Sequence, residues 1–384
     1  MMISIVALST DMMLPALGTI GADLRVANPN DTQLVISALF LGFATGQIIA
    51  GPVSDSIGRK PVIYAGYVLF MSGCLLAIFA TDFTMMLAGR VLQGLGASCP
   101  RIITIALVRD CYQGRVMARI MSIIMAIFII VPVIAPSIGQ AVVFAAGWRA
   151  IFVLFLTLAV ISSLWFAARQ PETLPSEARR RFSLSNIFSG IAEICSYRTA
   201  LGYTLGFGFI KGAFLGYLSS AQQVFQISFE TGLLFPIYFG IASFAIGAAA
   251  LLNSKMVMRF GMRFLTWRAL IGVAALSAAF IPLASVAGGV PPLWQFMAWQ
   301  LATFFCMGII FGNLNALAME PLGHMAGLGA AFVGSVSTFL SLPIAWAIGY
   351  SFDGGVLPLV TGFTVAGLIS LSVMAWTERK SAKL

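Results

Sequence analysis

Charged residues are scarce in this chain of 384 residues, because Lys, Arg, Asp and Glu together make up only 9% of it. A soluble domain contains roughly a quarter charged residues, so an ordinary soluble globular fold is excluded. A disordered chain is excluded as well, because disordered segments are poor in apolar residues, whereas 60% of this chain is apolar. This composition is typical of a helical membrane protein with about eleven or twelve spans of roughly 20 residues each.

Histidine and cysteine are also rare, with one histidine and five cysteines in the whole chain. A metal cluster cannot be built on His324 alone, and no two cysteines follow the Cys-x-x-Cys spacing of a metal or redox site. We therefore expect no metal ligands and interpret the cysteines as small buried apolar residues. A membrane-embedded enzyme would need a nucleophile–base pair or a metal cluster within the spans, so we expect no enzyme and no catalytic residue.

Apolar runs between turn and charge clusters predict an all-α protein with twelve membrane spans. The predicted spans are 1–22, 33–55, 62–80, 84–108, 116–143, 149–168, 198–222, 231–252, 264–285, 293–317, 326–349 and 355–376. The long polar stretch 169–197 is predicted to be a cytoplasmic linker between two six-helix bundles, 1–168 and 198–376, and 377–384 a cytoplasmic tail. Because the first span starts at Met1 without a polar tail, we expect the native chain to extend upstream.

The net charge of +9 could indicate a nucleic-acid binder, but the distribution of the charges argues against nucleic acid. Most basic residues lie in short gaps on one side of the predicted spans, and only Arg25 and Arg149 lie on the other side. Positive charge collects on the cytoplasmic side of membrane proteins. The sequence therefore predicts a multi-pass protein of the bacterial cytoplasmic (inner) membrane with both termini in the cytoplasm.

Five sequence segments form a recognisable pattern: the loop Gly51–Pro61, Arg90–Gly94 in span four, Gly147–Arg149 before span six, Pro171–Leu174 after it, and Ser9–Ala16 in span one. Together they resemble the major facilitator superfamily, and in particular its bicyclomycin/chloramphenicol-resistance branch of drug:proton antiporters. Arg109-Asp110 after span four fits the same pattern. The loops Gly51–Lys60 and Asn253–Arg263 occupy matching places in the two halves, which indicates an internal duplication. The resemblance implies two pseudo-symmetric bundles around a central cavity.

The Gly51–Pro61 loop is predicted to be a cytoplasmic gate consisting of Gly51, Asp55, Gly58 and Arg59. The glycines allow a tight turn and close helix approach, and Asp55 can pair with Arg59. The resemblance implies that Asp55 also latches the halves at the start of span eleven, near Gly327. The alternative is a solvated turn with a surface ion pair of little energetic value.

Span five carries the antiporter motif of this family in part. Where the family pattern ends in Gly-Pro-x-x-Gly-Gly, this chain has Ala135-Pro136-Ser137-Ile138-Gly139-Gln140. We expect the kink from Pro132 and Pro136 to survive, because proline removes a backbone hydrogen bond. Together with Gly139, these prolines form the span-five motif.

Four ionisable residues fall within predicted spans, where such residues are costly and mark functional sites. Asp11 is predicted to carry the proton, because loss of water disfavours a charged carboxyl group; the alternative is a polar residue bonded to the backbone near Pro15. The resemblance implies that Arg90 assists this proton coupling. For Lys211 we weigh a pair with Asp11 against a side chain that snorkels along the cavity wall. Arg101 is expected to contact substrate or to pair with Asp55 or Asp110.

The predicted substrate cavity contains Gln93, Arg101, Lys211, Tyr217, Phe304 and Asn313. An apolar wall with few polar anchors suits varied drug-like ligands, and the excess of positive charge within the spans favours neutral or weakly acidic compounds. The sequence thus predicts a monomeric exporter of small amphipathic compounds, driven by the proton gradient without a cofactor. The alternative is a metabolite or organic-anion carrier of the same fold, possibly working as a symporter.

Overall fold

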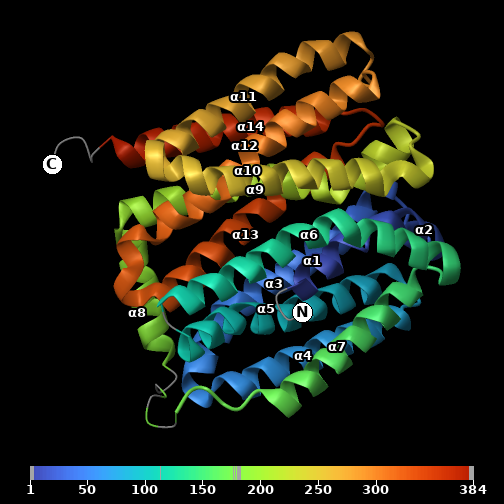
Figure 1. Ribbon diagram of the computed structural model, residues 1–384. Coiled ribbons are helices and arrows are strands. Elements are labelled where there is room, and N and C mark those ends of the chain that lie inside the picture. The colour runs from blue at the N-terminus through green and yellow to red at the C-terminus, as the bar shows by residue number, and fades with distance from the viewer. Residues whose placement is uncertain (1–3, 113, 176, 178, 180–182, 380–384) are drawn as a thin grey trace. The chain divides into compact units, whose positions relative to one another are not determined.

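The computed structural model describes residues 4–112, 114–175, 177, 179 and 183–379, which form helices and no strands (Figure 1). The chain divides into two compact units, Met1–Ser189 (unit 1) and Gly190–Leu384 (unit 2). Unit 1 contains α1 (Ser4–Asp11), η1 (Leu14–Ala16), α2 (Leu17–Asp23), η2 (Pro29–Gln33), α3 (Leu34–Ile57), α4 (Arg59–Ile78), α5 (Phe83–Cys111), α6 (Gly114–Ala146) and α7 (Arg149–Arg169).

Unit 2 contains a second series of long helices after α8 (Leu184–Ser196), which crosses the boundary between the units. The series consists of α9 (Arg198–Gln223), the π-helical turn η4 (Val224–Ser228), η5 (Gly232–Leu234), α10 (Phe235–Phe260), α11 (Met262–Val286), α12 (Leu293–Met319), η6 (Glu320–Met325), α13 (Ala326–Tyr350) and α14 (Leu357–Glu378). Every predicted span coincides with one long helix, apart from the first, which is broken into α1, η1 and α2.

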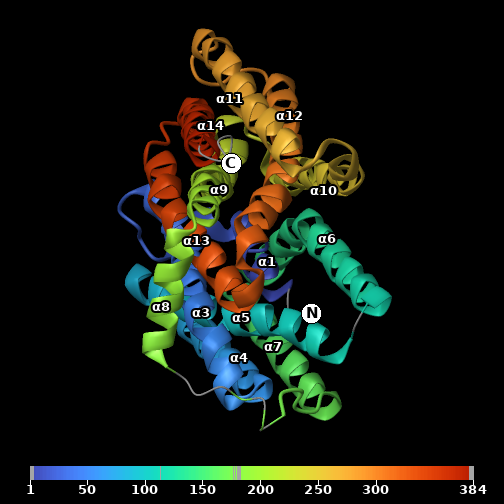
Figure 2. The same cartoon turned by 90° about the vertical axis from the view of Figure 1, so that its left-hand side faces the viewer.

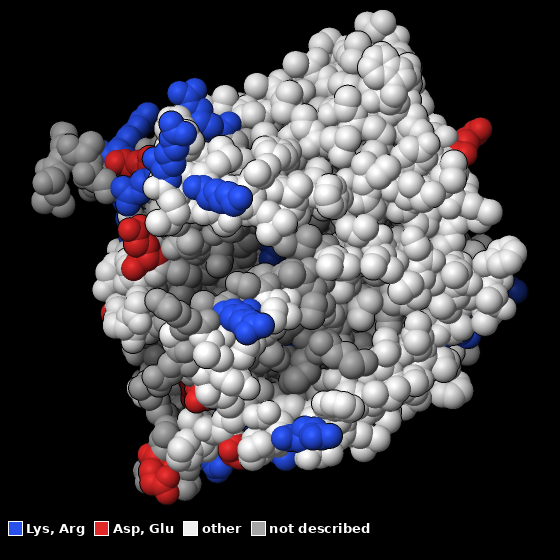
Figure 3. Space-filling model, in the orientation of Figure 1, with Lys and Arg blue, Asp and Glu red and all other residues white. Residues whose placement is uncertain are grey.

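The helices have the length and the surface of membrane spans. Among the described residues, nine helical segments are long and apolar enough to cross a membrane, and one of these, Leu293–Tyr350, holds both α12 and α13. Large apolar side chains such as Leu164, Trp165 and Phe244 are exposed on them. Figure 3 shows that the described charged side chains on the face drawn gather towards helix ends. The protein is therefore a multi-pass membrane protein.

The segment predicted to be a polar linker contains a helix that we did not expect. In α8, Ile187, Gly190, Ile191 and Ile194 lie on the side turned towards the protein, and Ile194 is fully buried. Gly190 lies against Leu328 of α13, and Glu193 bonds His324 of η6 at 2.9 Å. The helix is amphipathic. Its apolar residues recur every three or four positions, and this spacing could have predicted the helix from the sequence.

Close helix packing in unit 1 depends on glycines of α3 and α5. A Cβ atom on Gly42 would lie 2.0 Å from the Val91 carbonyl oxygen, and one on Gly94 would lie 1.9 Å from the Leu39 carbonyl oxygen. Such contacts bring the two backbones together, as small residues do at helix interfaces in membranes. Gly51 is different, because a Cβ there would meet no atom within 4 Å. The close approach expected at Gly51 is therefore absent among the described residues.

Two glycines form the tight turns of the matching loops. Gly58 lies between α3 and α4 with φ of 109°, and Gly261 lies between α10 and α11 with φ of 79°. Residues with a side chain rarely adopt these values, so glycine lets one helix end and the next begin within a single residue. The two units thus use a glycine with positive φ at corresponding turns.

The cysteines differ in accessibility. Cys74 and Cys99 are buried, and Cys306 is partly buried. Cys111, the last residue of α5 in unit 1, is exposed, as is Cys195 of α8 in unit 2. All five are free thiols. The interpretation of the cysteines as small buried residues is wrong for Cys111 and Cys195, because these two are exposed.

We expect Gly94→Ala to lower the midpoint of thermal unfolding, because the new methyl group would clash with the Leu39 carbonyl oxygen. Overpacking of this kind costs about 1–3 kcal/mol. Thermal unfolding of the purified protein in detergent measures the effect. Gly51→Ala is the control, since its methyl group meets open space, and equal midpoints for the two variants would contradict the packing role of Gly94.

Candidate functional site

The first span breaks at Asp11, which is the last residue of α1. Pro15 has no N–H group and interrupts the helix. The Met13 N–H then donates to the Thr10 carbonyl oxygen at 3.2 Å instead of the Ser9 carbonyl oxygen, which an α-helix would use. The Ser9 carbonyl oxygen is therefore left without its usual partner at the break.

Arg90 of α5 occupies the position left open by this break. Its Nη2 donates to the Ser9 carbonyl oxygen at 2.8 Å, and its Nε donates to the Val35 carbonyl oxygen of α3 at 3.1 Å. Its Nη1 donates to Gln93 Oε1 at 2.7 Å, while Gln93 Nε2 reaches Cys74 Sγ of α4 at 3.1 Å. With a fully buried side chain, Arg90 joins the broken span to α3 and α5.

Asp11 lies beside this network without joining it. Its residue surface is 4% exposed. In the part of the chain that the structure describes, no hydrogen bond or ion pair to its carboxylate is found. A buried negative charge without a partner is costly, and a protonated carboxyl group avoids most of that cost. The site can therefore hold a proton.

The span-five motif meets the same break. Pro136 and Gly139 of α6 are buried, and a Cβ atom on Gly139 would lie 2.1 Å from the Met12 carbonyl oxygen. Only glycine leaves room for this approach. Pro132 lies one helical turn before Pro136 within α6, which is continuous through both prolines. The motif thus brings α6 against the backbone next to Asp11.

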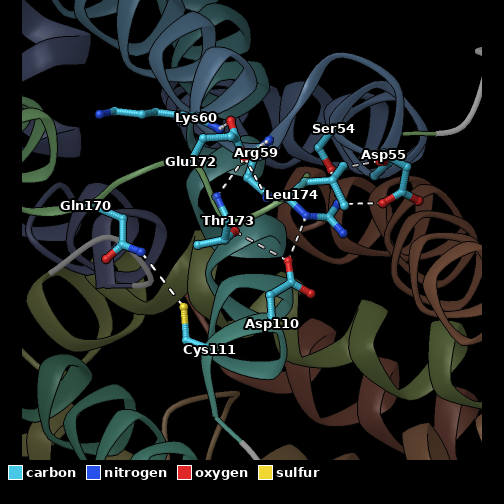
Figure 4. Close-up of polar contacts among 11 residues, drawn as sticks. Ser54, Asp55, Arg59, Lys60, Asp110, Cys111, Gln170, Glu172, Thr173 and Leu174 are labelled. Carbon is cyan, nitrogen blue, oxygen red and sulfur yellow. Dashed lines mark hydrogen bonds and ion pairs between the residues drawn. The ribbon is translucent and has the colours of Figure 1, made fainter. Parts of the chain in front are cut away.

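The loop predicted to be a gate forms a charged network at one end of unit 1 (Figure 4). Arg59 has a side chain that is only 6% exposed, and it pairs with Asp55 at 2.5 Å and with Asp110 of α5 at 3.2 Å. Arg59 Nη1 also donates to Ser54 Oγ at 2.7 Å. Asp55 is half-exposed. The guanidinium group thus connects α3, α4 and α5 through two carboxylates.

Glu172, from the segment after α7, binds the start of α4 (Figure 4). Its carboxylate accepts the N–H groups of Arg59 and Lys60, and also those of Thr173 and Leu174, each at 3.0 Å. Desolvation raises the pKa of Glu172, but these four N–H bonds outweigh it and lower the pKa below its usual value. The carboxylate also lies at the positive end of α4, where a negative charge is stabilised.

Polar residues of unit 2 join helices in pairs. Lys211 of α9 donates to Thr338 Oγ1 of α13 at 2.6 Å, and its Nζ is 5.7 Å from the Phe207 ring centroid. Asn313 of α12 and Asn253 of α10 exchange two amide hydrogen bonds of 2.9 and 3.1 Å. Thr338 and Asn253 were not singled out by sequence reasoning, which identifies polar residues within spans but not their distant partners.

The predicted aromatic wall also lies in unit 2. Tyr217 of α9 and Phe304 of α12 meet edge to face with ring centroids 4.7 Å apart, and Phe239 of α10 stacks on Tyr217 at 5.9 Å. In unit 1, Arg101 of α5 lies over the Phe43 ring at 5.3 Å. The structure therefore brings Tyr217 and Phe304 together, while a pair between Asp11 and Lys211 would join the two units and stays a prediction.

Comparison with known proteins identifies relatives along the whole chain. The sequence model of the Major Facilitator Superfamily matches residues 1–346. The uncharacterized MFS-type transporter YdgK of Bacillus subtilis is 29% identical, and the alignment covers 97% of this chain and 92% of YdgK. Multidrug resistance protein D of Escherichia coli is 26% identical over 88% of this chain and 83% of the relative. The bicyclomycin resistance protein homolog of Haemophilus influenzae is 26% identical over 95% of this chain and 91% of the relative.

The fold is shared with a solved transporter structure. The xylose transporter XylE from Escherichia coli, in a partially occluded inward open conformation, superposes with a TM-score of 0.72. The alignment covers 98% of this chain and 95% of that one, at 11% sequence identity. At this identity the likeness describes the fold alone. The expected architecture of two six-helix bundles is confirmed by this match and by the family match.

We expect Arg90→Lys to loosen the break in the first span. One ammonium nitrogen cannot reach both the Ser9 and Val35 carbonyl oxygens and Gln93, so a buried acceptor is left unsatisfied at a cost of about 1–3 kcal/mol. Hydrogen–deuterium exchange should become faster in peptides covering residues 4–23. Arg101→Lys in the same helix is the control, and unchanged exchange in Arg90→Lys would contradict the proposed link.

Glu172→Gln should lower thermal stability at neutral pH but not in acid. Because the pKa of Glu172 is lower in the folded protein, its stabilising contribution is present above the usual value of 4.5 and is lost as the pH falls through the folded value. We expect a stability loss of about 0.5–1 kcal/mol near pH 7. Unfolding midpoints of the variant and wild type should converge below pH 4.5. Glu230→Gln, at an exposed site, is the control, and the difference between its unfolding midpoint and that of wild type should not depend on pH in this way. If the midpoint of Glu172→Gln stays below that of wild type in acid, the assignment is refuted.

Proposed function

The chain belongs to the major facilitator superfamily, and we propose that it exports small amphipathic drug-like compounds, neutral or weakly acidic, in exchange for protons. One observation carries the proposal: Asp11 is buried at a helix break without an ionic partner among the described residues. Relatives named for multidrug and bicyclomycin resistance support the substrate class.

The proton step involves the Asp11 carboxylate alone. When the cavity opens to the proton-rich side, the carboxylate binds a proton and becomes neutral, which allows it to be buried again. On the other side, the carboxyl group gives up the proton when substrate is bound. Arg90 donates to the carbonyl oxygen of Ser9, which is two residues before Asp11, and thereby fixes the backbone that carries Asp11. We assign Arg90 a positioning role in proton coupling.

Substrate binding is assigned to the apolar and aromatic side chains of unit 2. Tyr217 and Phe304 are buried and in contact, and apolar walls with few polar anchors accept chemically varied ligands. Lys211 lies on α9 with Tyr217, and Asn313 lies on α12 with Phe304; we assign these two residues as polar anchors of the cavity. Of the four ionisable residues predicted within spans, three are cations, which favours neutral or weakly acidic compounds over cationic ones.

The charged loop is proposed to be the cytoplasmic gate. Asp55 is half-exposed although Arg59 binds it, so its carboxylate remains accessible to a further positive group, such as a helix N-terminus. The proposed latch to the start of α13 would join the two units. We place both termini in the cytoplasm, and the protein as a monomer in the bacterial inner membrane, because the basic loops collect on that side.

The experiment is substrate-induced proton release from purified protein, compared between wild type and Asp11→Asn. A panel of neutral and anionic compounds is added in weakly buffered detergent solution, and the pH is recorded. We expect a neutral drug to release protons from wild type and none from Asp11→Asn, because the amide has no proton to give. Asp31→Asn is the matched control, since Asp31 lies in the short turn η2 and outside the predicted spans.

The rival function gives a different result in the same experiment. If no compound releases protons, yet anions bind and Lys211→Ala abolishes that binding, the protein is an organic-anion carrier and the proposed exchange is wrong. Proton release that persists in Asp11→Asn would refute the role of Asp11 while keeping proton exchange.

A further inference from the structure

An apolar groove of about 360 Å³ runs along the outside of unit 2 between α9 and α14. These two helices pack against each other, and Figure 2 shows them side by side. The groove is lined by Leu205 of α9 and by Leu368, Ile369, Ser372, Val373 and Trp376 of α14. Leu368 is 53% exposed and Trp376 47% exposed, so the groove opens on the surface of the unit.

The groove is suited to hydrocarbon. Its single polar lining side chain is Ser372, whose hydroxyl donates to the Leu368 carbonyl oxygen of the same helix at 2.9 Å. That hydroxyl is therefore engaged within α14. Between Leu368 and Trp376 the groove is about 12 Å long, since an α-helix rises about 1.5 Å per residue. A lipid acyl chain fits such a lining and such a length.

The positively charged side chain of Arg198 lies at one end of the groove. Arg198, the first residue of α9, has its Cζ 4.5 Å from the ring centroid of Trp376. Its Nε is buried, and the described residues provide no hydrogen-bond acceptor for it. That nitrogen cannot be reached from outside the protein, but the guanidinium charge is delocalised over the whole group, which attracts an anion.

The neighbouring acid is already engaged. Glu378, two residues beyond Trp376, accepts from Tyr203 Oη and from Trp267 Nε1, each at 2.8 Å. The next residue, Arg379, is exposed. Arg198 and Arg379 thus bring two positive charges to this end of the groove, where both oxygens of Glu378 are bonded within the protein. The charge at this end of the groove favours an anion.

The depths of these groups match a phospholipid. Arg198 and Trp376 lie within the terminal turns of their helices, where Trp and Arg mark the membrane–water interface. Leu205 and Leu368 lie about 10–15 Å further along the helices, at the depth of the acyl chains. The cation is thus at headgroup depth, and the groove leads from it into the hydrocarbon.

We propose that unit 2 binds an anionic phospholipid, with one acyl chain in the groove and the phosphate bound by the guanidinium group of Arg198. Other arginines of unit 2, such as Arg268 over Phe264 at 5.2 Å, also lie on aromatic rings. Arg198 is distinguished by the groove beside it. The proposal depends on the membrane location of the protein and not on which substrate it exports or on proton exchange.

Native mass spectrometry of the whole purified protein tests this site. Dioleoyl phosphatidylglycerol and dioleoyl phosphatidylcholine are added separately, because they share acyl chains and differ in headgroup charge. We expect wild type to retain phosphatidylglycerol preferentially. Arg198→Gln should weaken its binding about fivefold, the effect of one basic residue at a membrane surface, and leave phosphatidylcholine unchanged. Arg198→Lys should restore part of the preference.

Two further variants separate the groove from general charge attraction. Ser372→Phe fills the groove and should reduce binding of both lipids. Arg268→Gln removes another cation that lies over an aromatic ring, at an exposed position outside the groove, and should match wild type. Unfolding midpoints confirm that each variant is folded. Equal retention of the two lipids by wild type, or an equal loss of preference in Arg268→Gln and Arg198→Gln, would overturn the proposal.

Discussion

The contact between Arg90 and the Ser9 carbonyl oxygen underlies the arrangement of unit 1. Inside a membrane no water is available to satisfy a backbone group that a broken helix leaves open. The break near Pro15 leaves such a group, and a guanidinium group from another helix supplies the missing donor. Arg90 is itself fully buried, so its charge is acceptable only because carbonyl and amide oxygens surround it. The break and the arginine therefore depend on each other.

The two units use related devices to hold helix ends together. In unit 1 a glycine of positive φ starts α4, and Glu172 binds the exposed N–H groups of that helix. In unit 2 a glycine of positive φ starts α11, and Glu378 binds Trp267 of that helix. Glu172 follows α7, the last long helix of unit 1, and Glu378 is the last residue of α14, the last long helix of unit 2. This parallel agrees with the internal duplication that the matching loops predict, which stays a prediction.

Much of the fold could be predicted from the sequence, because each span is a local apolar run; span four was placed at 84–108, and α5 extends over Phe83–Cys111. The pair of Asp55 with Arg59 was also within reach, as these residues are one helical turn apart. Thr338 as the partner of Lys211 was not, because the two residues are 127 positions apart. Nor was the role of Glu172, although its motif was noted. Periodicity describes a helix face, whereas the partner of that face is decided by tertiary packing.

The two exposed cysteines give the protein a reporter pair of its own. Cys111 lies in unit 1 and Cys195 in unit 2, and the remaining thiols are buried or partly buried. Thiol-specific spin labels or fluorophores would therefore attach first at one accessible position in each half. The distance between the labels could then be followed during turnover in the unmutated chain, so rearrangement of the halves could be recorded spectroscopically without a cysteine-free background.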